Sequence, residues 1–149
     1  MGLFPEPKKK VMIVDDEITI RELVEFTLEP EFSVIKAVNG EEALSKLSEN
    51  PDIIILDIMM PRMDGYEVCH RLKSDAVTKK IPIVMLTAKH LVPDIKKAIE
   101  LQVDEYITKP FEPDLLRKRI RAILAGEKQA SNKLFQAGKS LHYIKGQSQ

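Results

Sequence analysis

The strongest constraint on the fold is a regular alternation of short apolar runs with longer segments that have helical periodicity. Five runs are candidate strands: residues 11–14, 33–37, 53–56, 83–86 and a weaker 105–107. The first, third and fourth runs are apolar at nearly every position, which is typical of strands covered by helices on both faces. We therefore expect a parallel sheet.

The segments between these runs predict helices. In the first, Ile18, Leu23, Phe26 and residues 27–28 form an amphipathic pattern, and in the second, over residues 41–47, the apolar face is made by Ala43, Leu44 and Leu47. Three more helices are expected over residues 66–72, 95–101 and 115–124, with Pro113 suited to the first turn of the last. This alternation indicates an α/β fold: a three-layer, doubly wound, flavodoxin-like sandwich around a parallel five-stranded sheet, for which the strand order 2-1-3-4-5 is common.

The length suits one domain with a short extension. We expect the domain over residues 9–125 and an extension or linker over residues 126–149 of the 149-residue chain. In that extension Leu134, Leu141 and Ile144 have the spacing of one weak amphipathic helix, and a solvated tail is the alternative. In a longer parent chain a DNA-binding, cyclase or kinase module would follow here.

Charge and cysteine content limit the partners and the cellular compartment that we expect for this chain. Lys plus Arg and Asp plus Glu each number 23, so no global field attracts nucleic acid or an anionic membrane, and we expect this domain to contact neither. The single cysteine, Cys69, excludes a disulfide within the chain and fits the cytoplasm. The most apolar stretches, residues 53–60 and 81–88, are too short to span a bilayer, and the first ten residues lack a secretory signal.

Polar residues follow four of the five expected strands. They are Asp15-Asp16-Glu17, Asp57, Thr87-Ala88 and Lys109-Pro110. In open α/β sheets ligands bind outside the carboxyl ends of the strands, so these groups should converge. Clustered carboxylates need a cation, and an all-oxygen site favours Mg²⁺ or Mn²⁺ over zinc.

Lys109 would add a positive charge beside such a cation and Thr87 would add a hydroxyl, and both groups are suitable partners for phosphate oxygens. Asp57 stands alone at the end of the central strand and is therefore the best candidate nucleophile for an acyl phosphate. The pattern predicts a phosphoryl-transfer site.

Five motifs together resemble the receiver domains of two-component response regulators, in particular chemotaxis regulators. The resemblance runs from about Lys10 to Leu124 and rests on Asp15-Asp16, Asp57, Met60-Pro61-Arg62-Met63-Asp64-Gly65, Thr87-Ala88 and Tyr106-Ile107-Thr108-Lys109-Pro110-Phe111. Each motif alone is weak or moderate. Five in the right order and at strand ends are a strong combination.

The resemblance implies a role for each matched residue. Asp16, Asp57 and the backbone carbonyl of Met59 would bind Mg²⁺, with Asp15 acting through a bound water, while Thr87 and Lys109 would hold the phosphoryl oxygens. The donor would be a phosphohistidine on a sensor histidine kinase or a histidine phosphotransfer protein. The domain would phosphorylate and dephosphorylate itself at Asp57 and would otherwise not be an enzyme.

The resemblance also implies a switch. Thr87 would move toward the new phosphoryl group, Tyr106 would rotate into the vacated space, and the face made by helix four, strand five and helix five would change its binding of a downstream protein. Glu105 and Arg119 are our candidates for an ion pair across a phosphorylation-dependent homodimer of this face. A solvated basic helix is the alternative.

Other interpretations of the same residues stay open at this point. Asp16 could cap the first helix, and Tyr106 could be an ordinary half-buried strand aromatic. A hydrolase acting on phosphate esters would need an acid-base aspartate where Met59 stands, and a module that is never phosphorylated would not need the intact acidic set. The chain departs from the family pattern at Pro93 and at Leu101-Gln102-Val103, where a glycine-alanine turn is usual.

Overall fold

A computed structural model describes residues 3–88 and 94–127 of the chain. Its described elements run in the order β1 (Lys10–Val14), α1 (Ile18–Leu28), β2 (Ser33–Ala37), α2 (Gly40–Ser45), η1 (Lys46–Glu49), β3 (Ile53–Asp57), α3 (Gly65–Lys73), η2 (Thr78–Lys80), β4 (Ile83–Ala88), α4 (Ile95–Glu100), β5 (Glu105–Lys109) and α5 (Pro113–Leu124). The five expected strands and the five helices expected up to residue 124 are present, and their ends differ from the predictions by a few residues.

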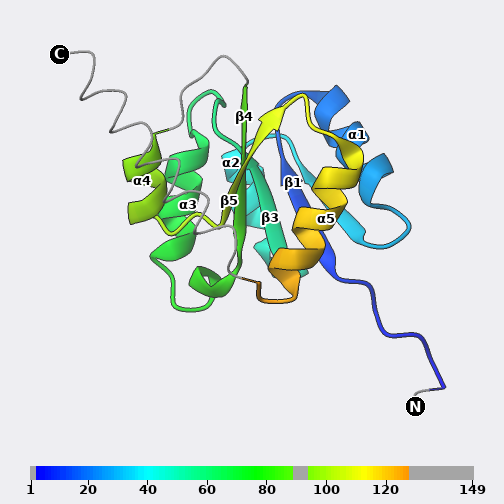
Figure 1. The fold of residues 1–149 in the computed structure, drawn as a ribbon. Helices are drawn as coiled ribbons and strands as arrows, with labels where there is room; N and C mark the ends of the chain where they lie inside the picture. Colours follow the sequence, from blue (N-terminus) through cyan, green and yellow to red (C-terminus); the bar gives the residue numbers. More distant parts are fainter. Residues whose placement is uncertain (1–2, 89–93, 128–149) are drawn as a thin grey trace.

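The five strands form one parallel sheet in the order β2-β1-β3-β4-β5 (Figure 1). This is the predicted order, and it makes β1 and β3 neighbours at the point where the chain reverses its direction of winding. The register pairs Val14 with Leu56, Asp57 with Leu86 and Ala88 with Lys109. All the strands therefore end at the same edge of the sheet.

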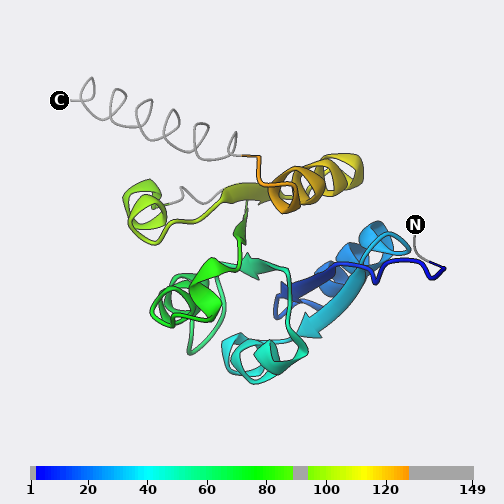
Figure 2. The ribbon, with the colours of Figure 1, turned by 90° about the horizontal axis from the view of Figure 1, so that it is seen from below.

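Helices cover both faces of the sheet, with α1 and α5 on one side and α2, α3 and α4 on the other (Figures 1 and 2). Alternate residues of each central strand contribute to two separate cores. Met12 of β1 and Met85 of β4 face the α2–α4 side, whereas Ile13 and Leu86 face the α1–α5 side. This double burial explains why β1, β3 and β4 are apolar at nearly every position.

Helix α1 buries residues 27–28 of the predicted stripe but not its other members. Phe26, Ile18 and Leu23 are exposed at 83%, 59% and 40%, and the residues that contact the core are Ile20, Val24, Thr27 and Leu28. The buried set follows the spacing i, i+4, i+7 and i+8, as a helix lying on a sheet requires. The apolar side chains of α1 are spread around much of its circumference, so periodicity alone did not identify the buried face.

The sequence Leu101-Gln102-Val103 after α4 forms a common type of helix end, with glutamine at the position that glycine normally occupies. The amide of Gln102 donates to the carbonyl of Ile99 at 3.1 Å and that of Val103 to Ala98 at 3.0 Å, which is the hydrogen-bond pattern of a Schellman motif. Gln102 has a φ of 57°, in the left-handed region where glycine is normally found. The departure from the family pattern therefore keeps the turn but places a side chain on a strained backbone.

Cys69 is a buried free thiol, and the Lys109–Pro110 peptide bond is cis. None of the helices described is long and apolar enough to cross a membrane. Pro93 and the helix expected around Leu134, Leu141 and Ile144 lie outside the described residues.

Candidate functional site

The polar groups at the strand ends meet around the side chain of Lys109. Its Nζ lies 2.7 Å from Asp15 Oδ2, 3.4 Å from Asp57 Oδ1 and 3.7 Å from Glu17 Oε1. These residues come from the ends of β1, β3 and β5 and are separated by up to 94 positions in the sequence. The convergence predicted from the strand ends is therefore confirmed for Asp15, Asp57 and Lys109.

The turn after β1 is held by both backbone and side-chain hydrogen bonds. Asp15 is fully buried, its amide donates to the carbonyl of Ala37 at 3.2 Å, and its Oδ1 accepts the amide of Glu17 at 2.9 Å. Arg21 donates from Nη1 to the Asp15 carbonyl at 2.8 Å. This arrangement turns Asp16 outward to solvent, and α1 has Glu17 as its N-cap with no side-chain cap, so Asp16 is not a helix cap.

The loop after β3 packs tightly beneath Asp57. This carboxylate is 4% exposed, and its Oδ1 accepts the amide of Met59 at 3.3 Å. The amide of Gly65 donates to the carbonyl of Ile58 at 2.9 Å, which brings the start of α3 against the end of the strand. A Cβ at Gly65 would lie 2.4 Å from the backbone oxygen of Asp57, so only glycine fits there.

Thr87 and Tyr106 lie on the β4 and β5 side of the site. Thr87 is 3% exposed, and its hydroxyl donates at a long 3.5 Å to the carbonyl of Ala88. Tyr106 is half-buried against the α2–α4 core, and its hydroxyl is 2.9 Å from that of Tyr66 on α3. Met59, at the mouth of the site, is 62% exposed.

The site has more negative than positive charge. Burial, followed by the charge of Asp15, raises the pKa of Asp57 from 3.8 to about 7. Burial also raises the pKa of Asp15, despite its contacts with Lys109. Although burial lowers the pKa of Lys109, its bond to Asp15 and the charges around it outweigh that effect and raise it. One ammonium does not compensate the carboxylates around it.

This shortage of positive charge fits a cation, and the donors present fit a hard one. Ligand oxygens of Asp15, Asp16 and Glu17 lie within 4.8 Å of one another, and the Asp57 carboxylate contacts the same lysine as Asp15. All of these donors are oxygens, which is the ligand type that Mg²⁺ and Mn²⁺ prefer. The predicted metal ligands Asp15, Asp16 and Asp57 are thus on one edge, with Met59 two residues beyond Asp57.

Sequence reasoning missed two residues that shape this edge and gave a third no role of its own. Glu17 was expected among the converging groups but not as a metal ligand, and here it joins the acidic cluster and contacts Lys109. Arg21 holds the turn through a backbone carbonyl, which leaves no mark in the sequence. Tyr66 bonds to Tyr106 from 40 residues away, and nothing in the sequence indicates that pair.

Fold and site together define a flavodoxin-like α/β protein with an acidic, lysine-bridged site at the carboxyl edge of its sheet. The sequence model of the response regulator receiver domain matches residues 11–121. The chain therefore belongs to the response regulator receiver domain family. Receiver domains are the modules of two-component signalling that interact with histidine kinases and phosphotransfer proteins, and in general they depend on Mg²⁺.

Curated relatives and solved structures agree with this assignment. The chain is 46% identical to the alkaline phosphatase synthesis transcriptional regulatory protein PhoP of Bacillus subtilis, over 78% of this chain and 48% of that protein. It is 42% identical to the transcriptional regulatory protein ResD of the same organism, over 82% of this chain and 50% of that protein. The chain thus spans about half the length of the curated relatives it matches.

Among solved structures, the chemotaxis response regulator CheY4 of Vibrio cholerae is 33% identical, with a TM-score of 0.71 over 78% of this chain and 98% of that one. The beryllofluoride-activated receiver domain of DrrB is 31% identical, with a TM-score of 0.70 over 79% of this chain and 98% of that one.

Proposed function

We propose that this domain is a signalling switch that accepts a phosphoryl group on Asp57 from a phosphohistidine of a sensor histidine kinase or a phosphotransfer protein. The observation that carries the proposal is the buried Asp57 carboxylate, 3.4 Å from the ammonium of Lys109 and beside a second buried carboxylate. In the transfer an Asp57 oxygen would bond to phosphorus as the phosphorus–nitrogen bond of the donor breaks, and the donor histidine would keep that electron pair.

Lys109 and Thr87 have complementary parts in this step. The Lys109 ammonium would neutralise charge on the phosphoryl oxygens, and the Thr87 hydroxyl would turn from the Ala88 carbonyl toward them, which its long 3.5 Å bond opposes only weakly. Asp15, Asp16, Asp57 and the Met59 carbonyl would hold Mg²⁺, or Mn²⁺ in its place, which when bound would supply positive charge for the phosphoryl oxygens. Hydrolysis of the acyl phosphate by the same domain would reset the switch.

The site is tested with a small phosphodonor. Wild-type protein incubated with Mg²⁺ and acetyl phosphate should gain one labile phosphoryl group by intact-mass measurement, and Asp57→Ala should gain none. The matched control is Asp52→Ala, because Asp52 lies just before the start of β3, at the opposite end from Asp57, and should not affect labelling. A wild type that stays unlabelled, or an Asp57→Ala variant that is labelled equally, refutes the assignment.

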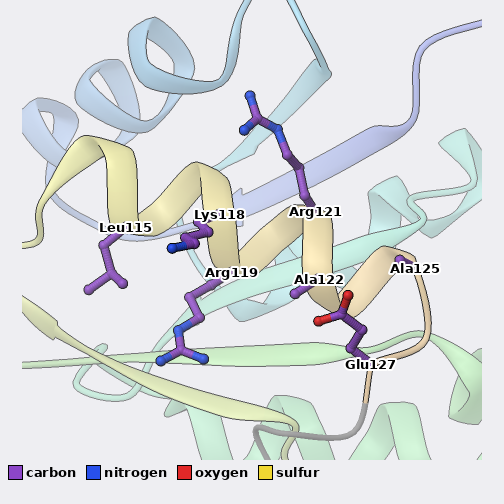
Figure 3. A pocket seen from close by; sticks show the side chains of 7 residues that line it. All are labelled: Leu115, Lys118, Arg119, Arg121, Ala122, Ala125 and Glu127. Atoms are coloured by element: carbon purple, nitrogen blue, oxygen red, sulfur yellow. The ribbon is translucent and has the colours of Figure 1, made fainter.

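We further propose that the output surface is the face made by α4, β5 and α5. Tyr106 and Arg119 line the same depression of about 230 Å³ between β5 and α5, so a rotation of the tyrosine would alter it directly. A second depression of about 520 Å³ continues along α5 and shares Arg119 with the first (Figure 3). Its basic side chains, which include Lys118 and Arg121, would suit acidic groups on a downstream protein.

The predicted ion pair of this face forms within one chain. Arg119 Nη1 lies 3.5 Å from Glu105 Oε2, so no second copy is needed to bring the two together. An exchange of this pair across a phosphorylation-dependent homodimer stays a prediction. Sedimentation with and without beryllofluoride tests it, and an unchanged mass would rule out dimerisation driven by phosphorylation.

The bounds of the domain and its cellular compartment are further parts of the proposal. We propose that residues 9–125 form the receiver unit and that residues 126–149 are an extension or linker. Helix α5 ends at Leu124, and Gly126, with φ 80°, closes a second Schellman motif there. The buried free thiol of Cys69 suits the reducing cytoplasm, which is where we place the protein.

A further inference from the structure

A chain of hydrogen bonds joins α3, β5 and the start of α4 through Tyr66. The hydroxyl of Tyr66 lies 2.9 Å from that of Tyr106 on β5, and its oxygen accepts the backbone amide of Asp94 at 3.1 Å. Asp94 is the N-cap of α4, where its Oδ1 accepts the amide of Lys97 at 3.0 Å. One phenol oxygen therefore contacts both the switch tyrosine and the helix of the proposed output face.

The position of Tyr66 is fixed by the packing of its neighbour Gly65 against the backbone of residues 57–58. It directly follows Gly65, whose amide bonds to Ile58 and whose Cα packs on the backbone of Asp57. The Tyr66 side chain is only 8% exposed, and the ammonium of Lys97 lies 5.0 Å from its ring centroid. Tyr66 thus stands between the loop after Asp57 and the start of α4 in a well-defined place.

These contacts hold Tyr106 in an inward orientation in this structure. Its ring packs on the α2–α4 core, and burial, followed by the bond to Tyr66, raises the pKa of its hydroxyl. An outward rotation would separate the two hydroxyls and leave the buried Tyr66 hydroxyl with one partner fewer. A neutral hydrogen bond of this kind contributes on the order of 1 kcal/mol, which is a population ratio of about fivefold.

We propose that Tyr66 is a positioning residue that holds Tyr106 inward before phosphorylation and ties that orientation to the start of α4. The proposal rests on the switch proposed above, in which the inward orientation of Tyr106 belongs to the phosphorylated state. Tyr66 then favours that orientation in advance, so the phosphoryl group needs to shift the population less. The coupling uses contacts separate from the Thr87 hydroxyl.

The test removes one oxygen with Tyr66→Phe and follows the switch by NMR. The amide of Asp94 should exchange with solvent about fivefold faster, because its acceptor is gone. The ring signals of Tyr106 should move in the direction that marks solvent exposure, and the concentration of beryllofluoride for half-saturation should rise, by up to about fivefold. Ser74→Ala is the matched control, since it removes a hydroxyl bonded to the His70 carbonyl at the other end of α3.

A double-mutant cycle separates the hydroxyl pair from general effects on folding. Tyr106→Phe should raise the unfolding equilibrium constant about fivefold, and Tyr66→Phe, which also removes the acceptor of the Asp94 amide, should raise it at least as much. The double variant should raise it by clearly less than the product of the two. If the effects of the two substitutions on the unfolding equilibrium constant simply multiply, the proposal is overturned. It is also overturned if Tyr66→Phe leaves the exchange of the Asp94 amide and the Tyr106 signals unchanged, or if this variant binds beryllofluoride more tightly than the wild type. Failure of the wild type to bind beryllofluoride would instead overturn the switch on which the proposal rests.

Discussion

Replacing Asp57 by asparagine should stabilise the folded protein in the absence of Mg²⁺. The side chain is 4% exposed, and burial and Asp15 raise its pKa from 3.8 to about 7. At ~1.4 kcal/mol for each pH unit, this rise corresponds to at most about 4 kcal/mol of lost stability above pH 7. Asparagine keeps the oxygen that accepts the Met59 amide and removes the charge.

The sign of the pH dependence follows from the raised pKa. Between about pH 4 and pH 7 the folded protein retains a proton on Asp57 that the unfolded chain has released, so the free energy of unfolding falls as the pH rises through this window. The advantage of Asp57→Asn should therefore reach about 2–4 kcal/mol at pH 8 and be less than about 2 kcal/mol at pH 5.

Urea denaturation in EDTA at both pH values measures this difference. Glu22→Gln is the control, because it changes the net charge equally on the exposed surface of α1. Added Mg²⁺ should stabilise the wild type at pH 8 and stabilise Asp57→Asn less. An Asp57→Asn variant that is no more stable than the wild type at pH 8, or whose advantage is the same at pH 5, would refute the electrostatic account of the site.

Three further substitutions test other parts of the structure. Gln102→Gly should raise the free energy of unfolding by about 1 kcal/mol, because glycine removes the strain of φ 57° after α4, and a loss of stability in urea would contradict this. Gly65→Ala should lower the melting temperature far more than Gly126→Ala, since a Cβ at the first would meet backbone oxygen at 2.4 Å and one at the second meets nothing within 4 Å; equal losses would be inconsistent with the clash. Lys109→Met should cost about 3–5 kcal/mol at pH 8 in EDTA and less at pH 5, where the buried carboxylates are more protonated, and a cost independent of pH would argue against the ion pairs.

The sheet and the convergence of the site were predictable from the sequence for one physical reason. Strands covered on both faces must be apolar, so a polar residue such as Asp57 stands out at the strand end, and parallel strands bring such ends to one edge. The contact of Lys109 with Asp15 and Asp57 then follows from topology. The strand order itself came from how common it is among five-stranded folds of this type.

Predictions failed or were absent where packing rather than periodicity decides. Helix α1 carries apolar residues on several sides, and only its placement against β2 and α5 selects Val24 over Phe26. The Tyr66–Tyr106 pair depends on the distance between α3 and β5, which no sequence spacing encodes. At Gln102 the sequence signalled a departure, and only the backbone shows that the turn is kept.

The central claim is that Asp57 itself carries the phosphoryl group. The most direct measurement is reduction of the acetyl phosphate-treated protein with borohydride, which converts an aspartyl phosphate to homoserine, followed by peptide mass spectrometry. The account predicts homoserine at position 57, dependent on Mg²⁺ and on the phosphodonor, with Asp15 and Asp16 unmodified. Homoserine at either of those positions, or none at position 57 in protein that has gained a phosphoryl group, would contradict it.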